Sequence, residues 1–302
     1  MEEMTTGLCP KCGHTLQIPA ELERFSCMYC GERLTKRQLL TQPEEASCSE
    51  EDCAASFDHA VSRLGWCVQN FRGYQKKILR DAFFEAFETY ETGCAPVIQE
   101  LNSGVRPERQ TELLDRAAEA MLDELSAGWE KKTDMDDEKI ILAIFFVPMV
   151  RKLQLPVSEE FVSLLQKKWV ERYPKSPFYL GDYESISGGF RKKFLGLCFI
   201  TTAVCQELGK PDDCAELTAF RAFRDGYLAA QPDGEALIRE YYNIAPGIVT
   251  CINTCSDRHA SYERIREQYL TPCYEDLLAG RNADCKTRYV QMVRDLEREY
   301  LN

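Results

Sequence analysis

Two Cys-x-x-Cys pairs near the amino terminus carry the clearest chemical signal in this sequence. The first is Cys9-Pro-Lys-Cys12, the second is Cys27-Met-Tyr-Cys30, and a glycine follows each pair. Each pair forms a tight turn that points its two sulfur atoms to one side, and the glycine supplies the backbone freedom that the turn requires. Four thiolates complete the tetrahedral coordination of Zn²⁺, so the spacing predicts one structural zinc ion held by all four cysteines.

The segment that must position these sulfur atoms is small. Residues 15–18 and Phe25 are suited to short strands between the two cysteine turns, which together predict a zinc ribbon in residues 1–38. About 35 residues cannot bury enough apolar surface to fold alone. Zinc would therefore serve as the core, with an apparent binding free energy of roughly 10–16 kcal/mol. Buried thiols or disulfides are the alternative interpretation of the four cysteines, and the two glycines argue against it.

The charge distribution bears on the kind of partner. The net charge is −12, yet residues 1–40 hold five Lys or Arg and five Asp or Glu, so the predicted ribbon is neutral. Residues 41–60 hold six acidic residues and no Lys or Arg, and residues 39–56 are predicted to be an acidic linker. Proteins that bind nucleic acid use basic surface to displace phosphate counterions. Nucleic-acid binding through the ribbon is therefore disfavoured.

The compartment is inferred from two features. The first residues contain neither a basic region nor an apolar run, and the longest apolar stretch, 140–150, is eleven residues long, too short to cross a bilayer. The 15 cysteines are an odd number, and four of them already form a metal pattern. We therefore expect a cytoplasmic protein with reduced thiols and no membrane segment.

From Phe57 onward, apolar residues recur at the three-and-four spacing of helices, and no strand alternation is visible. The predicted fold class is all-α: about nine or ten helices, in a middle region (57–180) and a carboxy-terminal region (181–302), preceded by the small ribbon. One helix is expected to begin near Pro107 and end near Gly128. Residues 140–147 are apolar on all sides and predict a central buried helix, which Pro148 would kink or end.

Three short motifs within residues 190–250 follow one another in a specific order. They are Cys198, Phe199, Ile200, Thr202 and Ala203; then Phe220, Arg221, Phe223, Arg224, Asp225 and Leu228; then Tyr241, Tyr242 and Pro246. This succession resembles the bacterial CFI-box carboxy-terminal family with an amino-terminal zinc ribbon. The resemblance covers about a fifth of the chain and implies a bacterial, cytoplasmic setting. It implies no particular activity.

The second and third motifs contain groups that could form a polar site. Arg221, Arg224 and Asp225 lie within one helical turn of each other, and Arg221 could also reach the acids at 212 and 213. These side chains predict a structural ion network that fixes two helices. The alternative is an anion pocket formed by the two arginines with Tyr241 and Tyr242.

Several other cysteines are candidates for chemistry. Cys251, Cys255 and His259 are spaced four apart, which predicts one helical stripe. They could pack as core residues, bind a second metal with help from Cys273 or Cys285, or form a reactive cysteine–histidine pair. Cys198 is a further candidate for a reactive thiol, although no histidine is near it in sequence.

The predicted function is protein interaction. A closed tetrathiolate site is structural, and the sequence holds no zincin, nucleophile-elbow, phosphate-loop or dinucleotide motif. We expect a zinc-binding bacterial protein that docks another protein, with no catalytic residues. The alternative is an enzyme or redox sensor that uses a body cysteine, with nucleic-acid binding as a weaker one. Partner identity and oligomeric state stay open at this stage.

Overall fold

The computed structural model describes residues 4–10, 15–40, 49–191, 198–254 and 257–302. Of the residues described, 72% are helical, and the strands among them form two small two-stranded sheets near the amino terminus. The predicted fold class, an all-α body preceded by a small strand region, is therefore confirmed. Fifteen α-helical segments are distinguished in the described residues, which is a finer division than the nine or ten helices expected from periodicity.

The amino-terminal unit contains both sheets and one short helix. Strand β1 (Met4–Leu8) pairs antiparallel with β2 (Thr15–Pro19), and β3 (Arg24–Ser26) pairs antiparallel with β4 (Arg33–Thr35). Helix α1 (Lys36–Leu40) follows β4 directly. Alternate residues of β2 are buried, as expected for a strand with one face on a core.

The helical body begins at residue 50. Its first half contains α2 (Glu50–Leu64), α3 (Trp66–Gln69), η1 (Tyr74–Lys77), α4 (Phe83–Gly104), η2 (Pro107–Arg109), α5 (Gln110–Ala127), α6 (Lys132–Ile141), η3 (Leu142–Phe146), α7 (Val147–Leu153), α8 (Ser158–Arg172) and α9 (Tyr183–Arg191). Its second half contains α10 (Phe199–Glu207), α11 (Ala215–Ala222), η4 (Phe223–Leu228), α12 (Gly234–Thr254), α13 (Arg258–Ile265), η5 (Arg266–Leu270), α14 (Thr271–Leu278) and α15 (Asn282–Tyr300). The helix predicted between Pro107 and Gly128 is confirmed as η2 and α5.

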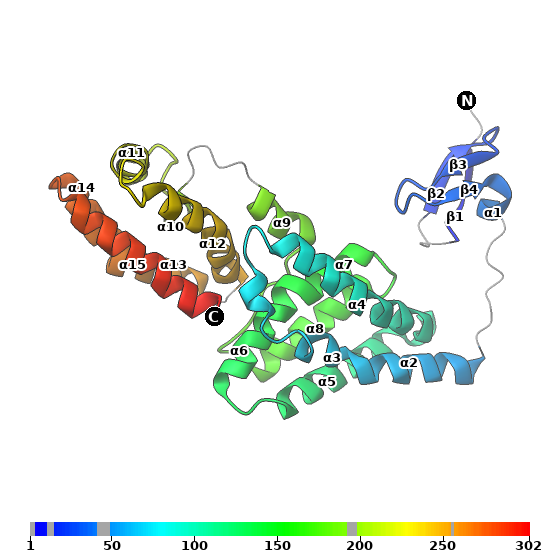
Figure 1. Cartoon of the computed structure of the whole chain (residues 1–302). Coiled ribbons are helices and arrows are strands. Elements are labelled where there is room, and N and C mark those ends of the chain that lie inside the picture. Colours follow the sequence, from blue (N-terminus) through cyan, green and yellow to red (C-terminus); the bar gives the residue numbers. More distant parts are fainter. Residues whose placement is uncertain (1–3, 11–14, 41–48, 192–197, 255–256) are drawn as a thin grey trace.

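Helices α10–α15 gather beside α2–α9 (Figure 1). One continuous cluster of buried residues nevertheless runs from Phe57 to Leu301. Helix α12 joins the two groups, because Asn243 accepts hydrogen bonds from the backbone N–H groups of Arg80 (3.0 Å) and Asp81 (3.1 Å). Gly247 is needed at this crossing, since a Cβ there would lie 1.9 Å from the carbonyl oxygen of Ile78.

Helix α2 begins inside the segment that we expected to be a linker. It starts at Glu50, whereas the sequence pattern places the start of the helical body at Phe57 and the linker at 39–56. The Ser49 side chain accepts a hydrogen bond from the Asp52 N–H at 3.1 Å, which is a helix N-cap. Acidic residues 50–52 fill the first turn, where they interact favourably with the helix dipole. Their charge, which suggested a solvated tether, also favours a helix start.

The helix containing Pro148 does not end there. Residues 141–150 are all buried, as the apolar run predicts, and the chain passes from α6 through the π-helical turn η3 into α7. The N–H of Val147 donates to the carbonyl of Leu142, five residues earlier. Proline clashes with the carbonyl four residues before it and donates no hydrogen bond. The wider π turn accommodates Pro148, and η5 precedes Pro272 in the same way.

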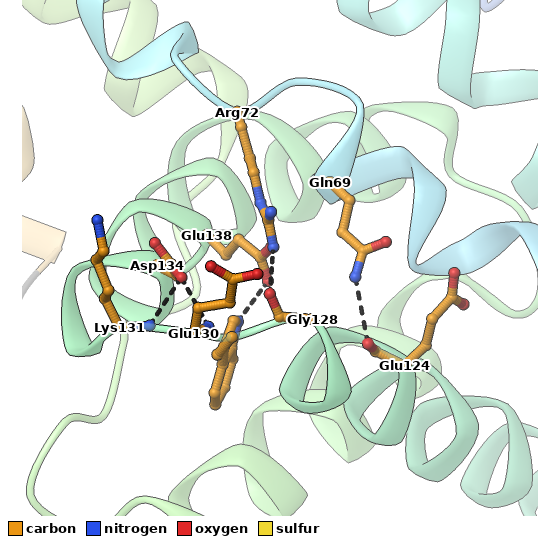
Figure 2. Close-up of polar contacts among 9 residues, drawn as sticks. Gln69, Arg72, Glu124, Gly128, Glu130, Lys131, Asp134 and Glu138 are labelled. Carbon is orange, nitrogen blue, oxygen red and sulfur yellow. Dashed lines mark hydrogen bonds and ion pairs between the residues drawn. The ribbon is translucent and has the colours of Figure 1, made fainter.

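A buried carboxylate fixes the beginning of the continuous segment formed by α6, η3 and α7, which we call the central rod. Glu138 on α6 is fully buried, and Arg72 donates to its Oε1 from Nε (2.8 Å) and Nη2 (2.5 Å). The indole Nε1 of Trp129 donates to the other oxygen at 2.7 Å. Arg72 also donates to the carbonyl of Gly128 at 3.2 Å, so one arginine ties the α3–η1 connection to the loop before α6 (Figure 2).

We expect Arg72→Ala to destabilise the body by about 3 kcal/mol, because it leaves the Glu138 carboxylate buried without its cation. Urea unfolding followed by tryptophan fluorescence measures the change, and Trp129 reports directly on this site. Arg109→Ala is the matched control, since Arg109 pairs with Glu112 on the exposed surface and should show no resolvable loss. Equal effects of the two substitutions would contradict the role assigned to Glu138.

Candidate metal centre

The β1–β2 hairpin brings the first cysteine turn into position. Cys9 directly follows β1 and is buried, while β2 runs back antiparallel beside it. Cys12 falls in residues 11–14, outside the described residues, so its predicted role as a ligand stays a prediction. Helix α1 covers this hairpin, and Gly7 permits the approach because a Cβ there would lie 2.3 Å from the carbonyl oxygen of Leu39.

The second cysteine turn links β3 to β4. Cys27 is buried and Cys30 is exposed. The N–H of Cys27 donates to the carbonyl of Glu32 at 2.8 Å, and the N–H of Gly31 donates to the carbonyl of Cys27 at 2.9 Å. Gly31 has a φ of 73°, a left-handed conformation that favours glycine. The glycine after the second pair therefore has the conformational role that the sequence predicts.

Three sulfur atoms converge between the two turns. The Sγ atoms of Cys9, Cys27 and Cys30 all lie within 4.8 Å of one another. The Cys9 and Cys30 sulfurs are 3.8 Å apart, far longer than a disulfide bond of about 2.05 Å. A tetrahedral site with Zn–S bonds of about 2.3 Å has sulfur–sulfur edges of about 3.8 Å. The donor set therefore fits a thiolate-binding metal ion.

The apolar core around these sulfurs is very small. It consists of Leu16, Ile18, Leu34 and Leu39 together with Cys9 and Cys27, and Phe25 packs against it. Two of its six buried members are thus candidate metal ligands. An apolar core of this size is small for a unit that folds alone.

The outside of the same unit carries apolar side chains. Eight large hydrophobic side chains are exposed in the described residues, and four of them are Met4, Leu22, Met28 and Tyr29. Met28, at 77% exposure, and Tyr29, at 55%, stand between the two cysteines of the second turn. The smaller unit of the chain therefore holds half of the exposed large apolar side chains.

The structure brings most of the predicted carboxy-terminal polar residues together. Arg224 is buried, pairs with Asp225 through two hydrogen bonds (2.7 and 2.8 Å), and approaches the Cys198 sulfur at 3.6 Å. Tyr242 also hydrogen-bonds Arg224, and the hydroxyl of Tyr241 accepts from the Ile200 N–H at 2.9 Å. The guanidinium of Arg224 thus satisfies groups of its own protein, which favours a structural network over an anion pocket.

Arg221 lies outside this cluster. It donates to the Asp212 carboxylate at 2.9 Å and to the Asp212 carbonyl at 2.8 Å. Asp225 pairs with Arg224, its neighbour in sequence, and Arg221 pairs with Asp212, one of the two acids that the sequence placed within its reach. Arg221 therefore fixes the loop before α11 rather than a shared site.

Cys251 and His259 do not share a helix. Cys251 is fully buried on α12, which ends at Thr254, whereas His259 lies on α13, which begins at Arg258. The His259 side chain is 69% exposed and approaches Glu207 at 3.4 Å. Cys255 lies outside the described residues. The helical stripe expected from the four-residue spacing is therefore interrupted between Cys251 and His259.

The structure reveals thiol neighbours that sequence reasoning missed. Three pairs of thiols are neighbours: Cys67 with Cys94, Cys205 with Cys214, and Cys273 with Cys285. Two pairs join different helices, and the Cys205–Cys214 pair joins α10 to the loop that follows it. No short motif marks these pairs. The only sequence signal was a cysteine count well above the four that the ribbon uses.

No helix in the described residues is long and apolar enough to cross a bilayer. Comparison of the chain with protein-family models, with curated proteins and with solved structures found no match in any of the three. The assignment of function therefore rests on the residues of this chain.

Gly7→Ala is expected to loosen the amino-terminal unit, because the added methyl group would collide with the backbone of Leu39. Faster amide hydrogen exchange in β1 and β2 measures this effect. Gly188→Ala is the control, since nothing lies within 4 Å of a Cβ at that helical position and exchange in β1 and β2 should not change. Unchanged exchange in the Gly7 variant would contradict the close packing of α1.

Cys198 is expected to react slowly with iodoacetamide in the native protein. Burial raises the pKa of its thiol, and the nearby guanidinium of Arg224 acts in the opposite direction without reversing the shift. We expect alkylation at pH 8 to be at least about tenfold slower than that of glutathione. Peptide mass spectrometry measures the rate, with urea-unfolded protein as the control. A rate equal to that of glutathione would support the enzyme or redox-sensor alternative.

Proposed function

We propose that this chain is a zinc-dependent protein-interaction module in which the amino-terminal ribbon docks another protein. Cys9, Cys12, Cys27 and Cys30 would hold one structural Zn²⁺. The helical body would supply the scaffold behind the ribbon. Following the CFI-box resemblance, we place this module in the bacterial cytoplasm.

The choice of zinc follows from the donor set. Three sulfurs converge at the spacing of a tetrahedral thiolate site, and the Cys-x-x-Cys motif adds Cys12 as the fourth ligand. A site closed by four thiolates has no vacancy for a substrate. Its contribution is the folding of the ribbon.

The observation that carries the docking proposal is the exposure of Met28 and Tyr29. Both stand on the turn whose ends are Cys27 and Cys30, so their positions depend directly on the metal centre. Aromatic residues and methionine are enriched in the centres of protein interfaces. The ribbon carries as many acidic as basic residues, which favours a protein partner over nucleic acid.

A photo-crosslinking residue in place of Met28 tests this proposal in bacterial cells. We expect a discrete protein adduct that disappears when Cys27→Ser is added, because the turn then loses its metal. The matched control is the same residue in place of Leu278, which is 71% exposed on the helical body. Adducts that are identical from both positions, or that survive loss of the metal centre, would contradict docking by the ribbon. A nuclease-sensitive adduct would favour nucleic acid.

A further inference from the structure

A second set of metal-type ligands lies in the carboxy-terminal half of the body. Cys205 is near the end of α10, Cys214 directly precedes α11, and Glu216 lies in the first turn of α11. One ligand atom from each lies within 4.8 Å of the other two. We propose that Cys205, Cys214 and Glu216 form a second zinc site, separate from the ribbon.

The backbone holds these three residues together. The chain between α10 and α11 turns at Gly209, where φ is 68°. The N–H of Lys210 donates to the carbonyl of Cys205 at 2.8 Å, and the N–H of Cys214 donates to the carbonyl of Pro211 at 3.1 Å. These bonds place the two cysteines beside each other without any contribution from an ion.

The separation of the two sulfurs suits a metal. They are 3.8 Å apart, the same distance as between Cys9 and Cys30, and equal to the edge of about 3.8 Å expected for a tetrahedral zinc thiolate. A disulfide would need them to close to about 2.05 Å. Thiolate and carboxylate donors together are typical of zinc, whereas magnesium and calcium take oxygen ligands.

The charges of the site balance around one divalent ion. Zinc binding would release one proton from each thiol to solvent, giving two thiolates beside the Glu216 carboxylate. These three negative charges and Zn²⁺ sum to −1, and the ammonium of Lys210, 2.5 Å from the Glu216 carboxylate, neutralises the remainder.

A hollow beside the ligands completes the site. Cys205, Lys210, Glu216 and Arg266 are among the residues that line it, and its volume is about 10 Å³, room for about one water-sized ligand. Three protein donors leave the fourth position of zinc to water. The Nε of Arg266 is buried and has no hydrogen-bond acceptor within the described residues. A zinc-bound water would supply that acceptor.

Native mass spectrometry of the full chain, equilibrated with zinc under reducing conditions, tests the proposal. We expect two zinc ions in the unmodified chain, one in Cys214→Ala, one in Cys27→Ser and none in the double variant. Cys67→Ala is the matched control, because it removes a buried cysteine from a thiol pair outside both clusters and should leave two ions. Circular dichroism checks that each variant is folded.

Glu216→Gln provides an independent measurement, since it keeps both thiols. Loss of a direct ligand should weaken the body site at least by the roughly tenfold that loss of a supporting partner costs, measured by competition with a chromophoric chelator. A single ion in the unmodified chain that Cys27→Ser removes would overturn the second site and leave the ribbon intact. A Cys205–Cys214 disulfide in place of zinc, or unchanged affinity in Glu216→Gln, would also overturn it.

Discussion

The helical body is organised around one carboxylate that has no contact with solvent. An ionised group in an apolar interior is costly unless charge and hydrogen bonds compensate it. Glu138 meets this condition only when Arg72 and Trp129, from two other segments, reach it together. The same contacts set the position of the rod formed by α6, η3 and α7, whose run of ten buried residues, 141–150, forms the centre of the core. The packing around the rod therefore depends on the hydrogen bonds that Arg72 and Trp129 donate to Glu138.

Much of the helical fold could be predicted because its signals are local. The apolar run after residue 140 implies burial on all sides, and the residues between Pro107 and Gly128 show both ends of one helix. At two places the local sequence signal did not decide the outcome, for one shared reason. Acidic residues 50–52 and Pro148 have two possible effects on a helix, and the choice depends on neighbours. Ser49 supplies the cap in one case, and the π turn provides the space in the other.

The ribbon cysteines could be predicted from sequence and the contacts within the body could not, because only the ribbon signal is local. The ribbon cysteines are recognisable because each pair sits in one four-residue turn, so spacing alone predicts their convergence. Cys205 and Cys214 are brought together by a turn between two helices, and their separation of nine positions is not the Cys-x-x-Cys spacing. The contact of Arg224 with Cys198 joins residues 26 positions apart and required the packing of α10 against α11. Such pairs become visible only in three dimensions.

The π turn before α7 also has a consequence for how this core can change over time. A π turn contains one residue more than the α-helical turn it replaces, and each helical residue turns the chain by about 100°. Deleting one residue from 142–146 would therefore rotate every side chain of Val147–Leu153 by that angle relative to α6. Arg151 and Lys152, which now reach Glu159 and Glu91 at the surface, would be turned toward the interior. Insertions and deletions in this segment are therefore expected to be tolerated less well than exchanges of one apolar side chain for another of similar volume.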